Sequence, residues 1–274
     1  MTGVQTCALP ISTAFGELVA LNRFTGKQRW AVELKEELTT PPAFANGRLY
    51  LMSSEEAITA VSVEGKPLWK FRREATTGFT IRGNATPVVA HGLLYAAFSD
   101  GNVAALTLDA GVAKWMRNAS GTGDYLDVDS LAAPEDDKLV YAASAKAGVV
   151  ALNALTGEPV WTYPLPGANH VIVDRNRVYA MGRGAAVALS RRDGKKLWGL
   201  KLGSERYATA PSIAEHLLLF ALDRGPLLAV ETDTGRARGA FDPGSGFSQG
   251  PLALPGAALL VSNEGALFTL GLLP

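Results

Sequence analysis

Short apolar segments, each four or five residues long and separated by glycine-containing turns, recur along the whole chain. Six of them carry an alanine at the same place, as in 58–61 and 149–152. In five copies a glycine and then, four residues later, a tryptophan follow the segment: Gly26, Gly65, Gly111, Gly157 and Gly194, with Trp30, Trp69, Trp115, Trp161 and Trp198. A sixth copy keeps Gly235 but has Gly239 in the tryptophan position. The repeat length averages about 42 residues, which is typical of repeat architectures.

Each unit reads as strand, turn, strand, turn, strand, turn and tryptophan strand. Four short strands in about 42 residues are the size of a β-propeller blade. The turns contain pairs such as Asn46-Gly47, which tolerate the positive φ that tight hairpins require. Since no amphipathic helix of ten or more residues is evident, a helical solenoid does not fit. The sequence therefore predicts an all-β propeller of four-stranded blades.

The repeat also predicts how many blades the chain contains. Five complete blades are expected from about Leu38 to Pro243, with two strands before them and three after them. That makes about six and a half blades. The last unit lacks its tryptophan strand, and a propeller must close its ring or cover its edges. We therefore expect about eight blades in the intact protein, closed by a strand that precedes the present start.

The first twelve residues differ from the rest of the chain. Residues 1–12 lie outside the repeat and contain neither a basic segment nor a sustained apolar stretch, so they are not a signal peptide. We expect residues 1–12 to be a non-native segment joined to a chain truncated at its N-terminus, and residues 13–274 to be a single propeller domain. The alternative is a genuine but divergent N-terminus. The only cysteine, Cys7, lies in this segment.

Composition excludes several classes of protein. The 26 basic and 26 acidic residues cancel, so no overall field favours nucleic acid. No apolar run reaches the 18 or so residues that span a bilayer. One cysteine and three scattered histidines argue against a disulfide framework and a zinc centre. We expect no catalytic residue, no cofactor, no metal and no small-molecule substrate.

The tryptophans have a structural and a functional interpretation. A large flat ring repeated once per blade would fill the gap between blades, and its N–H could reach a carbonyl of the neighbouring blade. An aromatic cage for a ligand is the alternative. We predict the packing role for all five.

The unit at 149–161 resembles the PQQ-type propeller repeat, which occurs in quinoprotein dehydrogenases and in non-enzymatic scaffolds. More specific segments resemble the BamB-type lipoprotein family of the outer-membrane β-barrel assembly machine. Segments 80–87 and 126–130 are similar to two interblade signatures of that family, and segments 171–179, 246–251 and 263–268 are similar to later ones. The resemblance runs in order from Gly16 to Leu270.

This resemblance implies a non-enzymatic scaffold that assists the assembly and insertion of β-barrel proteins in a Gram-negative bacterium. Such a subunit lies in the periplasm, is anchored to the outer membrane by an N-terminal lipid, and binds the periplasmic domain of the barrel-inserting component. Nascent outer-membrane proteins are a further candidate partner. The positions that match the family's partner contacts are Phe79, Ile81, Arg82, Asp127 and Asp129. Two features depart from the family: the lipid-bearing cysteine and the first blade are absent, and Phe79 and Ile81 stand where leucines are typical.

The repeat register places the charged members of this set together. Arg82 lies five residues before Pro87, and Asp127 lies five before Ala132, so they occupy equivalent positions in neighbouring blades. Glu37 has the same position in the preceding blade. Alternating charge beside apolar side chains is typical of a partner site. Alternatively, Arg82 only pairs with one of these acids, and the two roles can coexist.

An enzymatic interpretation remains as the alternative function. A PQQ-dependent dehydrogenase, or a ligand-binding relative, would require a calcium site and groups that sandwich the quinone. Asp124, Asp127 and Asp129 offer carboxylate oxygens that calcium could bind. The segment lacks the glycine turn and the distal glutamate of a calcium loop, which favours a solvated loop or a partner contact.

Overall fold

The computed structural model describes residues 8–13, 15–38, 40–73, 85–123, 126–203 and 206–272. All 26 secondary-structure elements within these ranges are strands, which confirms the all-β prediction. No helix in them is long and apolar enough to cross a membrane. The chain divides into two compact units, residues 1–140 with 153–158 and residues 141–152 with 159–274.

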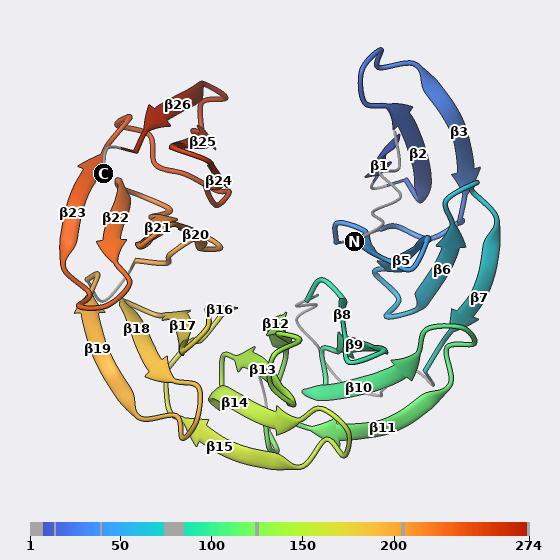
Figure 1. The fold of residues 1–274 in the computed structure, drawn as a ribbon, viewed down its shortest axis with the longest axis horizontal. Coiled ribbons are helices and arrows are strands. Elements are labelled where there is room, and N and C mark those ends of the chain that lie inside the picture. The colour runs from blue at the N-terminus through green and yellow to red at the C-terminus, as the bar shows by residue number, and fades with distance from the viewer. Residues whose placement is uncertain are drawn as a thin grey trace. The chain divides into compact units, whose positions relative to one another are not determined.

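The first unit contains three antiparallel sheets whose strands follow one another in chain order (Figure 1). The first sheet has three strands: β1 (Ala8–Ser12), β2 (Glu17–Asn22) and β3 (Gln28–Glu33). The second has four: β4 (Ala43–Ala45), β5 (Arg48–Met52), β6 (Ile58–Ser62) and β7 (Pro67–Phe71). The third has four: β8 (Val88–Ala90), β9 (Leu93–Ala97), β10 (Asn102–Thr107) and β11 (Ala113–Asn118).

The second unit contains three further antiparallel sheets of the same kind. They consist of β16 (His170–Val173), β17 (Arg177–Gly182), β18 (Ala185–Ser190) and β19 (Lys196–Lys201); of β20 (Ser212–Ala214), β21 (Leu217–Ala221), β22 (Leu227–Glu231) and β23 (Ala237–Phe241); and of β24 (Leu252–Leu254), β25 (Ala257–Val261) and β26 (Leu267–Gly271). One more four-stranded sheet has residues in both units: β12 (Val128–Ala132), β13 (Leu139–Ser144), β14 (Gly148–Asn153) and β15 (Pro159–Tyr163).

Five four-stranded sheets and a final sheet of three strands agree with the sequence prediction. The first sheet differs from it, because three strands are present where two were expected. The additional strand, β1, pairs with β2 from Ala8↔Asn22 to Ser12↔Leu18. The prediction missed it because Ala8–Ser12 lies outside the repeated pattern, while pairing to a strand edge needs only backbone groups.

Within each unit, consecutive sheets pack face to face through apolar side chains. In the first unit, Tyr50 and Ala60 of one sheet share a core cluster with Leu94 and Ala104 of the next. In the second unit, Tyr179 and Ala188 pack in the same way with Leu218 and Phe220. Period-two alternation in the strands supplies one apolar face to each neighbour.

Each of the five tryptophans connects the last strand of its sheet to a turn of the following sheet. Each indole Nε1–H donates to a backbone carbonyl oxygen at 2.8–3.0 Å, and the acceptors are Val63, Leu108, Ala154, Arg191 and Thr232 for Trp30, Trp69, Trp115, Trp161 and Trp198 respectively. This is the contact that the sequence analysis expects of these side chains. A buried indole N–H that is satisfied in this way avoids a desolvation penalty.

From the second copy of the repeat on, its glycine lies directly against the indole ring of the preceding sheet, whereas a Cβ on Gly26 would meet nothing within 4 Å. A Cβ on Gly111 would stand 2.5 Å from Cε3 of Trp69, and its φ of +66° also disfavours any larger residue. The other repeat glycines that meet an indole in this way are Gly65, Gly157, Gly194 and Gly235. The glycine and the tryptophan are therefore two halves of one contact between consecutive sheets.

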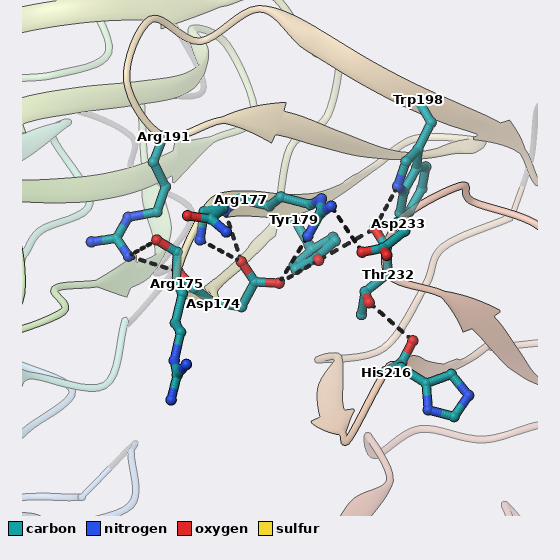
Figure 2. Close-up of polar contacts among 10 residues, drawn as sticks. Asp174, Arg175, Arg177, Tyr179, Arg191, Trp198, His216, Thr232 and Asp233 are labelled. Carbon is teal, nitrogen blue, oxygen red and sulfur yellow. Dashed lines mark hydrogen bonds and ion pairs between the residues drawn. The ribbon is translucent and has the colours of Figure 1, made fainter. Parts of the chain in front are cut away.

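A buried tyrosine accompanies four of the tryptophans. The pairs Tyr50–Trp69, Tyr95–Trp115, Tyr141–Trp161 and Tyr179–Trp198 have ring centroids 5.7–6.0 Å apart. The hydroxyl of Tyr179 donates to Asp174 Oδ2 at 2.6 Å and lies 3.4 Å from the Thr232 carbonyl oxygen that Trp198 also uses (Figure 2). We call this arrangement the Tyr–Trp lock. The sequence analysis did not identify the tyrosines as part of the repeat contact.

Candidate functional site

The structure describes only part of the predicted partner site. Phe79, Ile81 and Arg82 lie outside the described residues. Asp127 and Asp129 are described, at the start of β12. The site is therefore built here from these two carboxylates and from the side chains around them.

The carboxyl groups of Asp127 and Asp129 lie close enough to interact through a hydrogen bond and through charge. Asp127 is buried, and Asp129 is half-buried on the innermost strand of its sheet. Burial and the neighbouring Asp127 raise the pKa of Asp129 to about 8. Two carboxylates this close do not both ionise readily, so Asp129 holds a proton near pH 7. A positive charge held beside Asp129 would favour its ionised form.

A turn of the preceding sheet supports this pair. Gly101, in the turn between β9 and β10, has a φ of +83°, and a Cβ there would lie 2.9 Å from the Leu126 carbonyl oxygen and 2.8 Å from the Ser120 Cβ. Only glycine allows the backbone before Asp127 to approach so closely. The β9–β10 turn therefore packs against the backbone directly before Asp127.

The same turn holds a largely buried ion pair. Both Arg73 guanidinium nitrogens Nη1 and Nη2 bind the Asp100 carboxylate, the first at 2.9 Å from Oδ1. The guanidinium carbon of Arg73 lies 4.5 Å from the centre of the Phe98 ring. Burial alone would raise the pKa of Asp100, but hydrogen bonds from Arg73 and Asn102 lower it below its usual value. A bidentate, stacked arginine is held in one orientation.

Arg73 and Asp100 lie close to the described ends of the two predicted motifs in the sequence. Arg73 is the last described residue before 74–84, the stretch that contains Phe79, Ile81 and Arg82. Asp100 adjoins Gly101, against which the residues before Asp127 pack. We call Arg73, Asp100, Asp127 and Asp129 the β9–β10 corner. The sequence analysis did not identify Arg73 and Asp100, because an aspartate directly before a turn glycine is typical of an ordinary turn.

A second cluster of ion pairs lies beside the β4–β7 sheet. It is centred on Glu36, whereas the repeat register selects Glu37. The Glu36 carboxylate binds Lys70 Nζ at 2.5 Å and also contacts Arg72, whose Nη1 lies 2.8 Å from Glu55. Burial opposes ionisation of Glu36, yet hydrogen bonds from Lys70 and Ser53 lower its pKa. Glu37 itself is exposed. Both glutamates lie in the segment between β3 and β4, where no strand alternation applies.

The alternative chemistry finds little support in the described ranges. No group of three or more histidine, cysteine, aspartate or glutamate side chains that could hold a metal occurs there, and Asp124 lies outside them. His170 is half-buried, and burial lowers its pKa to about 4, so it is neutral near pH 7. A neutral imidazole on an inner strand does not by itself constitute a catalytic site.

A polar network in the second unit serves the fold. Asp174 accepts from the backbone N–H groups of Asn176 and Arg177, and Arg177 binds Asp233 at 2.8 Å (Figure 2). The guanidinium of Arg191 donates to the carbonyl oxygens of Asp174 and Arg175, both at 2.8 Å. The Arg177–Asp233 pair joins turns of consecutive sheets, and the Arg191 contacts join two turns of the same sheet. The side chain of Arg175 points away from this network (Figure 2).

Comparison with known proteins agrees with this arrangement. The family model described as outer membrane protein assembly factor BamB matches residues 5–134 and 126–240. The chain belongs to the BamB family. The PQQ-type repeat that the sequence analysis identified is the repeat of this family model.

Individual BamB proteins are similar over most of this chain. The outer membrane protein assembly factor BamB of Yersinia pestis is 26% identical over 258 residues, which cover 91% of this chain and 65% of that protein. The BamB of Xanthomonas campestris is 26% identical over 275 residues, covering 96% of this chain and 66% of that protein. The chain therefore spans a little under two thirds of these relatives.

Solved structures establish the propeller fold. The crystal structure of BamB from Moraxella catarrhalis superposes with a TM-score of 0.84 at 21% identity, covering 98% of this chain and 82% of that one. The computationally designed Ika8 protein gives a TM-score of 0.81 at 12% identity, covering 96% and 80%. The predicted β-propeller is thereby confirmed.

Proposed function

We propose that this BamB-family chain is a non-enzymatic periplasmic scaffold that assists the assembly and insertion of β-barrel proteins in the outer membrane. The observation that carries the proposal is the family match along both halves of the chain, together with the similarity to relatives that are outer membrane protein assembly factors. The Gram-negative sources of those relatives support a location at the periplasmic face of the outer membrane, with a lipid anchor as in the family.

In this proposal the partner is the periplasmic domain of the barrel-inserting component, with nascent outer-membrane proteins as a further candidate. Phe79 and Ile81 would supply apolar contact area, and Arg82 would orient the partner through charge. The β9–β10 corner supports this role, because it holds Arg73, directly before that segment, and packs against the backbone directly before Asp127. Asp129 keeps some exposure and would accept a basic partner group, while buried Asp127 would hold Asp129 in place.

The proposal is tested by capture from a Gram-negative envelope. The chain, secreted to the periplasm with an affinity tag, should retain the barrel-inserting component after mild solubilisation, in amounts comparable to its own. A tagged, unrelated propeller of the same size is the control for non-specific retention. Capture of no barrel-assembly component above that control would refute the scaffold role.

The alternative function is a quinoprotein dehydrogenase, or a ligand-binding relative, with PQQ and calcium as cofactors. It is favoured only by the shared repeat, which also occurs in such enzymes. Titrating the purified chain with quinone and calcium, and following the quinone absorbance, distinguishes the two. We expect no saturable change, and stoichiometric binding would establish the alternative.

A further inference from the structure

Three successive turns in the second unit each carry a basic side chain. These turns join the second strand of a sheet to the third, and contain Lys146 between β13 and β14, Arg183 between β17 and β18, and Arg224 between β21 and β22. The equivalent turns of three other sheets carry acidic residues instead: Glu55, Glu56, Asp100 and Glu264. Since the repeat accepts either charge at this turn, the basic residues are not a requirement of the fold.

The segment between β15 and β16 links the first two basic turns. In this segment, Gly167 donates its backbone N–H to the Ala145 carbonyl oxygen at 3.0 Å, and the Pro166 carbonyl oxygen accepts from the Arg183 N–H at 2.9 Å. A Cβ on Gly167 would lie 3.0 Å from the Arg183 Cβ, so the segment and the turn pack closely. Lys146 and Arg183 are therefore held on adjoining pieces of backbone.

The segment between β19 and β20 links the second basic turn to the third and contributes Arg206. The Arg206 carbonyl oxygen accepts from the Gly184 N–H, next to Arg183, at 3.0 Å. On its other side, a Cβ on Gly225 would lie 2.9 Å from Arg206 Nη1, so the guanidinium lies against the turn that contains Arg224. Arg206 thus stands between the other two arginines.

Hydrogen bonds fix this segment to the β21–β22 turn. The Asp223 N–H donates to the Tyr207 carbonyl oxygen at 3.1 Å, and the Asp223 carboxylate accepts from the Tyr207 N–H at 3.2 Å. Asp223 is the only acid among the described residues of these turns and segments, and Glu205 lies outside the described residues. The basic residues therefore outnumber the acidic ones by four to two.

We call Lys146, Arg183, Arg206 and Arg224 the basic arc. All four residues are exposed. No ion pair with a described residue involves Arg206 or Arg224. Lys146 and Arg183 also interact with other groups of the chain, so they are counted here for their charge. The arc is a row of cations on backbone segments that hydrogen bonds hold together.

We propose that the basic arc binds an acidic segment of a partner protein. A guanidinium binds a carboxylate through two parallel N–H donors, which gives an arginine-rich surface a preference for glutamate and aspartate side chains. Tyr207, beside Arg206 and 42% exposed, adds aromatic contact area, and tyrosine and arginine are enriched in protein interfaces. This inference does not depend on the proposed function.

A lipid surface fits the arc less well than a protein does. Peripheral binding to anionic lipids combines basic residues with apolar side chains that insert between the headgroups. In the described residues of these turns and segments, no large aliphatic side chain is exposed. The acidic protein segment is therefore the occupant that the surface favours.

Fluorescence anisotropy with a labelled oligoglutamate peptide at low ionic strength tests the proposal. The unmodified chain should bind this peptide saturably, less tightly as salt is added, and should bind an oligoglutamine peptide at least about tenfold more weakly. The triple variant Arg183→Gln, Arg206→Gln, Arg224→Gln should weaken oligoglutamate binding at least about fivefold. If circular dichroism shows the triple variant to be unfolded, Arg206→Gln with Arg224→Gln replaces it and should weaken binding at least about threefold.

The matched control removes the same charge from another basic cluster of the second unit. Arg192, Lys195 and Lys196 are exposed at the β18–β19 turn, at the other end of β18 from Arg183. The triple variant Arg192→Gln, Lys195→Gln, Lys196→Gln should bind oligoglutamate like the unmodified chain. Equal weakening by both variants would show attraction to net charge alone and would overturn the proposal. So would the absence of saturable oligoglutamate binding, including the case in which the chain instead binds phosphatidylglycerol vesicles through the arc.

Discussion

The sheets β16–β19 and β20–β23 are neighbours in the second unit, yet only the first has a Tyr–Trp lock. In β16–β19, Ala188 lies between Tyr179 and Trp198 in the strand register. In β20–β23, the equivalent Ala229 lies between Leu219 and Gly239. The outer strand β23 is correspondingly open: a Cβ on Gly239 would meet nothing within 4 Å, and residues 237–240 are exposed.

In these two sheets the tyrosine and the tryptophan are present together or absent together, whereas in the first sheet Trp30 stands beside Ala20 with Pro10 in the tyrosine position. In β16–β19 both side chains reach the Thr232 carbonyl oxygen, and they are replaced together one sheet later. The second junction depends instead on aliphatic packing and on an edge contact between Phe241 and Phe268, whose centroids are 4.9 Å apart. Hydrogen bonds to a fixed carbonyl add orientation to burial, whereas aliphatic packing alone is less specific.

The largest effect is expected for Trp198→Ala. It removes the indole from a buried site and leaves a cavity over Gly235, so the free energy of unfolding should fall by about 3–5 kcal/mol. Urea denaturation measures the loss. A change below about 1 kcal/mol would show that the lock contributes little beyond what the unlocked junction has.

Gly235→Ala should have the next largest effect. Its φ of +73° disfavours alanine, and the new Cβ would lie 2.6 Å from the Trp198 ring, so we expect a loss of about 2–3 kcal/mol. Gly256→Ala is the matched control, since Gly256 has a similar φ of +69° but open space around it, and should cost only about 1 kcal/mol. Equal losses for the two variants would contradict a specific glycine–indole contact.

Tyr179→Phe should lower the free energy of unfolding by about 1–2 kcal/mol, because it keeps the ring and removes the hydroxyl that donates a hydrogen bond to Asp174. Burial, and then Asp174, raise the pKa of Tyr179 above its usual 10. The folded state therefore holds this proton more tightly, and the stabilisation is complete below pH 10 and lost as the pH rises above it. Alkaline unfolding curves should show a weaker pH dependence for Tyr179→Phe than for the unmodified chain.

The smallest effect is expected at Gly239. Gly239→Ala should stabilise the protein by about 0.5 kcal/mol, because alanine restricts the unfolded chain and meets no neighbour on this open strand. Thermal denaturation detects the increase. Destabilisation would mean that the tryptophan position is confined even where the lock is absent.

The repeated pattern predicted most of the fold because each blade uses the same local chemistry. Turn glycines and the period of the tryptophans predicted five four-stranded sheets. The pattern could not predict β1, since a strand that only adds to an edge needs no particular side chains. It also passed over Tyr179 and its equivalents, because a tyrosine in an apolar strand resembles any other core residue until its hydroxyl partner is known.

The candidate site was less accessible to sequence reasoning. Family resemblance selected Asp127 and Asp129, but the raised pKa of Asp129 depends on burial, which no spacing shows. Arg73 and Asp100 are 27 residues apart and belong to different sheets, so their ion pair has no local signature. Single positions can be matched by resemblance, whereas contacts between residues far apart in the sequence depend on the packed fold.

The most direct test of the partner site is calorimetric titration of the chain with the periplasmic domain of the barrel-inserting component from the same bacterium. Arg82→Glu should weaken binding at least about tenfold, as reversing a charged interface contact does. Asp109→Lys is the control, since this exposed aspartate lies in the β10–β11 turn, at the end of β10 opposite to Asp100-Gly101. We predict unchanged affinity for Asp109→Lys, and unchanged affinity for a folded Arg82→Glu variant would contradict the site.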